Sequence, residues 1–63
     1  MTEKELLYFE DAVGHEKNII KIIEENKKQI DDERLINFFD NQVEIHKENI
    51  KKLINYVKEM ANE

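Results

Sequence analysis

His15, Glu16 and His46 are the side chains of this sequence best suited to bind a metal ion. Imidazole nitrogen and carboxylate oxygen are ligands for zinc, iron and manganese, and a carboxylate also neutralises charge inside a helical bundle. Asp11 lies one helical turn before His15 and Asn49 one turn after His46, so both join the candidate ligand set. The chain has no cysteine, which excludes disulfides and thiolate ligands. Without a metal, no general base or nucleophile constellation is complete, so we do not predict an enzyme.

A second interpretation gives the same residues a structural role. Di-iron helical bundles carry Glu-x-x-His motifs, whereas Ala12 and Val43 stand three residues before the two histidines here. Neutral histidines that hydrogen-bond Glu16, Asn49 or a symmetry mate would form a polar layer. Such a layer fixes the register and the oligomeric state of a bundle. The sequence leaves both interpretations open.

Two helices are predicted to position these residues. Thr2 and Glu5 have the spacing of a capping box, so we expect a first helix over about 3–29. Asp31 is a suitable N-cap for a second helix over about 32–61. A turn at about 30–31 then joins the helices as antiparallel neighbours within a single domain, residues 1–63. The predicted fold class is all-α, a two-helix hairpin.

Apolar residues recur at steps of three and four in both predicted helices, which is the spacing of a bundle interface. The second helix carries a long stripe with flanking apolar residues, namely Ile36, Phe39, Val43, His46, Ile50, Leu53, Val57 and Met60, flanked by Leu35, Phe38, Ile45, Ile54 and Tyr56. The first helix has two adjacent stripes, namely Leu6, Phe9, Val13, Glu16, Ile20, Ile23 and Ile30, and Tyr8, Ala12, His15, Ile19 and Ile22. Because this apolar surface is broad, we predict that it packs against more than one neighbour.

Size strengthens this expectation. A 63-residue chain buries too little surface for a large core, and exposed apolar area costs about 25 cal/mol per Å². With disulfides excluded, association with a second copy is the expected source of stability. We therefore predict a homodimeric four-helix bundle, with larger assemblies left open.

An internal repeat links the two helices. The segment HEKNIIKII at 15–23 reappears as HKENIKKLI at 46–54, offset by 31 residues. The repeat predicts that His15 occupies in the first helix the interface position that His46 holds in the second. With the turn near residue 31, His15 and Glu16 also fall at the level of His46. A dimer axis through or along the bundle would bring both copies of this layer together.

Composition sets the remaining expectations. The formal net charge of −5 argues against a nucleic-acid partner, and no apolar run approaches a membrane span or a signal-peptide core. A cytoplasmic protein that associates with itself, and not with a membrane, is expected. Its function would be that of a small structural or interaction module.

Two resemblances extend this interpretation. The segment YFEDAVGHEKNI, followed by LINFFDNQVEIHKENIKKLINYV, resembles short clostridial ferritin-like hairpins related to rubrerythrin and spore-coat families. That resemblance implies iron bound by helix-borne ligands, with Glu16 and His46 at the most similar positions. The length and the central turn also resemble the Rop-type hairpins, which dimerise and bind paired RNA loops. This second resemblance implies an RNA-binding stripe on Lys17, Lys21 and Lys28, interrupted by Glu24.

Overall fold

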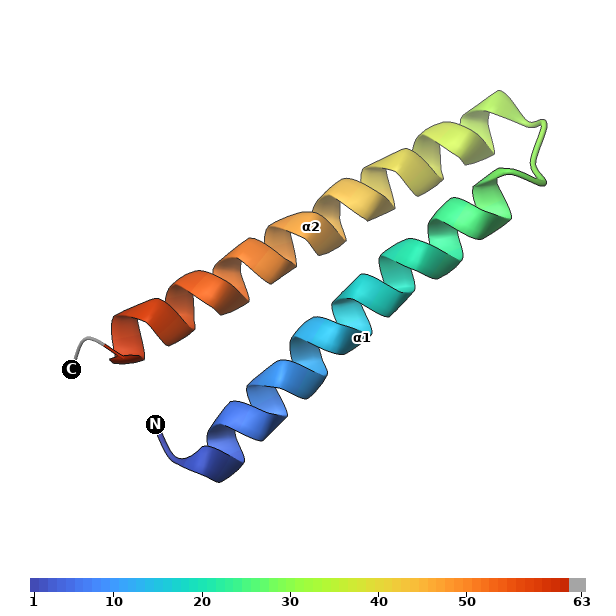
Figure 1. Ribbon diagram of the computed structural model, residues 1–63. Helices are drawn as coiled ribbons and strands as arrows, with labels where there is room; N and C mark the ends of the chain where they lie inside the picture. Colours follow the sequence, from blue (N-terminus) through green and yellow to red (C-terminus); the bar gives the residue numbers. More distant parts are fainter. Residues whose placement is uncertain (62–63) are drawn as a thin grey trace.

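The computed structural model describes residues 1–61, which form an antiparallel hairpin of two helices (Figure 1). Helix α1 spans Glu3–Lys27 and helix α2 spans Glu33–Ala61. The two helices lie side by side and pack against each other along their length, with both ends of the described chain at the end opposite the turn. The predicted all-α hairpin is confirmed for this part of the chain.

The first helix begins at the predicted capping box. The Thr2 hydroxyl accepts a hydrogen bond from the Glu5 backbone amide, and the Glu5 carboxylate accepts one from the Thr2 amide, both at 3.1 Å. The side chain and then the backbone amide of Thr2 hold the pKa of Glu5 below its ordinary value of 4.5. The box therefore satisfies two amides that the first helical turn would otherwise leave without partners.

The turn differs from its prediction by one or two residues. Helix α1 ends at Lys27, because Gln29 and Ile30 close tighter turns by donating to the carbonyls of Asn26 and Lys27 at 3.0 and 3.2 Å. The cap of α2 is Asp32, whose Oδ1 accepts from the Arg34 and Leu35 amides. The prediction of Asp31 as the cap was wrong, although the chemistry expected of it is present one residue later.

The interface between the helices is narrow, and we call it the seam. Val43, 3% exposed, is the one buried residue in the described part of the chain. The rest of the seam is part-buried and follows the predicted stripes, with Phe9, Val13, Glu16, Ile20 and Ile23 from α1 and Ile36, Phe39, His46, Ile50, Leu53, Val57 and Met60 from α2. The predicted stripe of α2 is confirmed, and the first stripe of α1 is its partner apart from Leu6, which is exposed.

A second apolar surface, which we call the exposed apolar face, lies beside the seam. It comprises Tyr8, Ile19 and Ile22 of α1 with Phe38, Ile45 and Tyr56 of α2, all of them exposed. On each helix these positions are separated by close to whole turns, so they share one side. Tyr8 and Tyr56 line a common groove, so the two sides belong to the same face of the hairpin.

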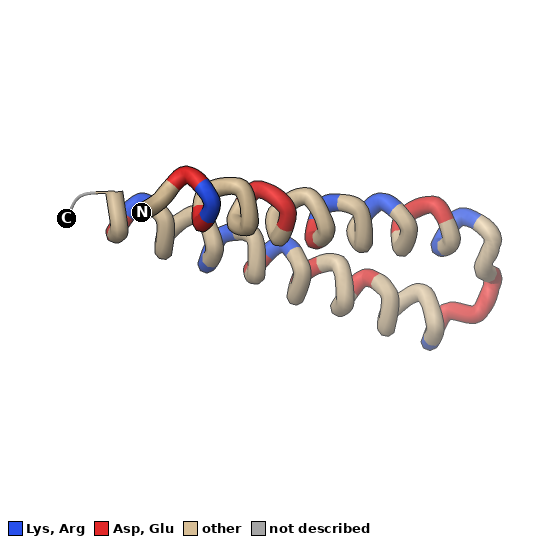
Figure 2. Tube along the Cα trace, turned by 90° about the horizontal axis from the view of Figure 1, so that it is seen from below, with Lys and Arg blue, Asp and Glu red and all other residues tan. Residues whose placement is uncertain are grey.

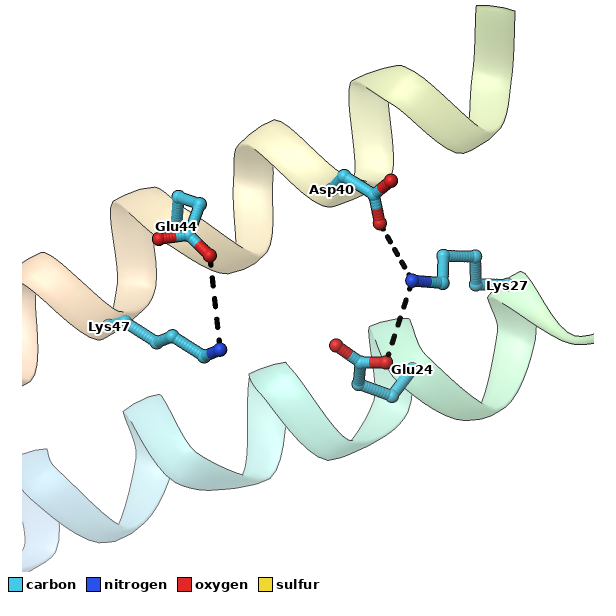
Figure 3. A network of polar contacts seen from close by, with 5 residues as sticks. All are labelled: Glu24, Lys27, Asp40, Glu44 and Lys47. Atoms are coloured by element: carbon cyan, nitrogen blue, oxygen red, sulfur yellow. Dashed lines mark hydrogen bonds and ion pairs between the residues drawn. The ribbon is translucent and has the colours of Figure 1, made fainter. Parts of the chain in front are cut away.

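The opposite side of the hairpin carries ion pairs, and we call it the charged face (Figure 3). Lys27 Nζ of α1 lies 2.7 Å from Asp40 Oδ1 of α2 and 3.7 Å from Glu24 Oε2. Glu44 and Lys47 form a further pair at 3.8 Å. Charged segments recur along both helices, and the turn is acidic (Figure 2). Over the residues described, neither helix combines the length and the apolarity needed to cross a membrane.

Candidate functional site

The site is centred on a hydrogen bond between the middles of the two helices. Nδ1 of His46 on α2 hydrogen-bonds Oε2 of Glu16 on α1, and both side chains are 21% exposed. When the Glu16 carboxylate is ionised it can only accept, and Nδ1 of His46 is then the donor. A neutral imidazole in that state leaves Nε2 as an acceptor or metal ligand. The pair is therefore both a polar contact in an apolar seam and half of a potential binding site.

A hollow opens beside this pair. Glu16, Asn49, Lys52, Leu53 and Tyr56 line it, and its volume is about 400 Å³. Tyr56 belongs to the exposed apolar face, so the hollow opens toward that face. The Glu16 carboxylate and the Asn49 side chain line the same hollow, which offers hydrogen-bonding groups to whatever covers it.

His15 does not lie where the repeat predicted. Residues adjacent in a helix are about 100° apart around its axis, so only one of His15 and Glu16 can face α2. Glu16 takes the seam position opposite His46, and His15 is exposed on the side of α1 that carries Tyr8 and Ile19. The prediction was wrong because α1 packs through its other stripe, which contains Phe9, Val13 and Ile20. Repeat similarity identified like residues but not the side that each helix would use.

The five candidate ligands are therefore only partly brought together. Glu16 and His46 are in contact, Asn49 lines the hollow with Glu16, and His15 and Asp11 are exposed. Within residues 1–61, no group of three or more His, Asp or Glu side chains is close enough to hold a metal ion. One hairpin alone thus supplies two ligands of the right chemistry rather than a coordination sphere.

Sequence reasoning missed two features of this region. It named neither Lys52 nor Tyr56 as a neighbour of Glu16, although both lie on the side of α2 marked by Phe38 and Ile45. It also missed the contact between Lys27 and Asp40 across the helices. The antiparallel levels that paired Glu16 with His46 place Asp40 more than a helical turn away from the height of Lys27, so the contact depends on the reach of the lysine side chain and could not be identified from levels.

No protein-family model matches the chain, and no curated protein and no solved structure matches it. The ferritin-like and Rop-type resemblances therefore stay predictions. The lysines that would carry RNA binding, Lys17, Lys21 and Lys28, are exposed, and the intervening Glu24 is paired with Lys27.

Proposed function

We propose that this chain is a small interaction module that associates with a second copy through its exposed apolar face to form a four-helix bundle. The observation that supports the proposal is the contrast between Val43, the single buried residue among residues 1–61, and the set of large apolar side chains left in solvent on the exposed apolar face. Tyr8, Tyr56 and Phe38 are all more than half exposed on that face. Covering apolar surface on this scale is the main driving force of protein association.

The dimensions of the hairpin suit such a dimer. Its Cα trace extends 48 × 17 × 9 Å, so the broad side has a footprint of about 800 Å². That is the area that each partner contributes to an interface of typical size. Stacking two broad sides would also give α1 and α2 the second neighbour that their apolar surface requires.

Mass by light scattering, measured over a range of protein concentrations, tests this proposal. We expect a dimer, which Ile45→Glu converts to a monomer by burying a charge in the new interface. Ile54→Glu is a matched control because Ile54 is the same residue on the same helix with similar exposure, 39% against 45%. The two positions are nine residues apart, about two and a half turns, so they lie on opposite sides of α2.

The control should remain dimeric. A monomeric parent chain, or equal effects of the two substitutions, would contradict the proposal. A dimer that survives Ile45→Glu would place the interface elsewhere.

The polar pair supports a second candidate function, the binding of a divalent metal ion such as zinc, iron(II) or manganese(II) in the assembled bundle. Glu16 and His46 supply one carboxylate and one imidazole at a solvent-accessible hollow. A second copy would have to supply the additional ligands, for which His15 is the candidate on the same side of α1. This function therefore depends on the dimer.

Elemental analysis after incubation with each metal and removal of excess ion tests metal binding. We expect bound metal that is lost in Glu16→Ala and in His46→Ala but kept in Glu24→Ala, which removes a carboxylate from the charged face. A metal-free dimer would leave the Glu16–His46 pair with a purely structural role.

A further inference from the structure

We infer that two hairpins dock with their turns at the same end, and that His15 of each copy enters the hollow beside Glu16 and Asn49 of the other. This inference rests on the proposed dimer and goes further, since it specifies the orientation of the partner and the contact that selects it. The hairpin can stack on a copy in two symmetric ways, with the dyad either parallel or perpendicular to its helices. In the first way the turns meet at one end, and in the second they lie at opposite ends.

The levels of residues within one hairpin decide between these arrangements. A dyad parallel to the helices leaves every residue at the height of its own copy, and it stacks α1 of one copy on α2 of the other. Contacts across the interface then follow from heights within the hairpin. Glu16 meets His46 in the seam, and Tyr8 and Tyr56 line one groove. These two observations indicate which residues of α1 and α2 lie at similar heights along the exposed apolar face.

At these heights, the residues that α1 and α2 contribute to the exposed apolar face match in polarity. Tyr8 is level with Tyr56, His15 with Asn49, and Ile19 with Ile45. In a same-end dimer, aromatic thus meets aromatic, polar meets polar and isoleucine meets isoleucine at successive levels.

The opposite-end arrangement keeps His15 away from the Asn49 side of the hollow. It stacks each helix on its own copy in antiparallel orientation. When its dyad lies at the level of His15, His15 is set against His15 and Asn49 against Asn49. The imidazole of one copy then faces the same imidazole of the other, not the amide of Asn49.

Burial of His15 in the dimer would make the orientation of the two hairpins depend on the level of His15 and Asn49. His15 is exposed in the single hairpin and would be covered in the dimer, where an imidazole without a hydrogen-bond partner costs free energy. The hollow provides partners, because Glu16 uses Oε2 for His46 and keeps its other oxygen, and Asn49 offers an amide. His15 of the second copy would extend the Glu16–His46 contact into a network of three residues, and the same-end orientation is the one that also sets it against Asn49.

Spin labels can measure this orientation directly, because the chain has no cysteine to remove. Three single-cysteine variants are labelled separately: Gln29→Cys in the turn, Glu3→Cys at the start of α1, and Gly14→Cys midway between them. A Cβ atom at Gly14 would meet nothing within 4 Å, so we expect this label to leave the packing undisturbed. Pulsed electron–electron dipolar spectroscopy on each dimer then gives the distance between identical labels.

We expect distances within about 30 Å for all three labels, since neighbouring helices in a bundle lie about 10 Å apart. An opposite-end dimer would keep the Gly14 distance short. It would separate the Gln29 labels by about 40 Å or more, because the hairpin is 48 Å long. Long Gln29 and Glu3 distances would therefore overturn the inference while leaving the dimer intact. The absence of dipolar coupling at Gly14, with a monomeric mass, would overturn the dimer itself.

The role of His15 has its own test on the Gln29→Cys background. We expect His15→Leu to stay dimeric but to add a long-distance population, because removing the polar group removes the preference for one orientation. His15→Gln, which keeps hydrogen-bonding groups, should retain a single short distance. An unchanged distribution in His15→Leu would overturn the assignment of His15 as the orienting residue.

Discussion

The two faces of the hairpin differ in how far a single chain satisfies them. On the charged face, Lys27 reaches from α1 to Asp40 on α2 and Lys47 pairs with Glu44, so these charged groups find partners within the chain. On the exposed apolar face, Tyr8 and Tyr56 are 61% and 60% exposed, although the Lys4 ammonium lies over the Tyr8 ring. The same two helices thus present one surface whose charged groups pair within the chain and one surface whose apolar groups stay exposed to solvent.

This difference supports the proposal that the exposed apolar face, and not the charged face, meets a second molecule. Ion pairs in water contribute little and are satisfied locally by flexible side chains. The exposed apolar side chains cannot be buried within one hairpin, because its two helices form only one interface and other residues already fill that interface. The stability of this fold should therefore depend strongly on the exposed apolar face and weakly on the charged face.

The largest effect is expected when the exposed apolar face is made to resemble the charged one. Ile19→Glu combined with Ile45→Glu should abolish both assembly and most of the helical structure at micromolar concentration, because a seam with one buried residue cannot hold two helices alone. Circular dichroism at 222 nm measures the loss. In the parent chain the thermal midpoint should rise with concentration, as mass action requires of a dimer.

A substitution in the seam should rank second. Val43→Ala removes two carbon atoms from the one buried position of the described chain and should lower the free energy of unfolding by about 2 kcal/mol. Urea denaturation at fixed protein concentration checks the value. A loss as small as that of an exposed valine would show that the seam is looser than its burial indicates.

The sequence predicted the seam well and the use of the second stripe poorly. Steps of three and four marked Val43, His46 and Ile50, because burial against one neighbour imposes helical spacing. His15 and Glu16 lie on adjacent stripes of equal plausibility, and only the packing of α1 on α2 decides which one faces inward. The hollow beside Glu16 could not be predicted either, since it depends on side-chain volumes across both helices.

The polar pair in the seam should have the third-largest effect, and its sign depends on how it is changed. Either single change, Glu16→Leu or His46→Leu, leaves the other group part-buried without its partner and should cost about 1.5 kcal/mol. The double variant should recover that loss, because leucine pairs well with leucine in an apolar seam. A double-mutant cycle in urea measures the coupling, and additive effects would show that the pair contributes nothing.

The capping box belongs to neither face, so the stability lost on changing it serves as a reference for the effect of a local interaction. Thr2→Ala should cost about 1 kcal/mol by leaving the Glu5 amide without its partner. The pKa of Glu5 is lowered in the folded chain, so its contribution is present above about pH 4.5 and fades as the pH falls through the folded value. The stability difference between the parent chain and Glu5→Gln should therefore shrink in acid, as urea denaturation at pH 7 and pH 3 would show.

The smallest effect is expected on the charged face. The hydrogen bond to Asp40, opposed by desolvation, raises the pKa of Lys27 above its ordinary value of 10.5. Its contribution is thus complete below that pH and is lost only as the pH rises through the higher folded value. Asp40→Asn should lower the unfolding midpoint by less than Thr2→Ala does, because water and salt screen an exposed pair.

Repeating that comparison in 1 M salt distinguishes a screened pair from a structural one. The Asp40→Asn effect should almost vanish there, while the Val43→Ala effect should persist because burial is insensitive to ionic screening. If Asp40→Asn were as costly as Val43→Ala at both salt concentrations, the link between Lys27 and Asp40 would be part of what holds the helices together. The charged face would then be a second interface that stabilises the packing of α1 on α2, and not a solvated surface with little effect on stability.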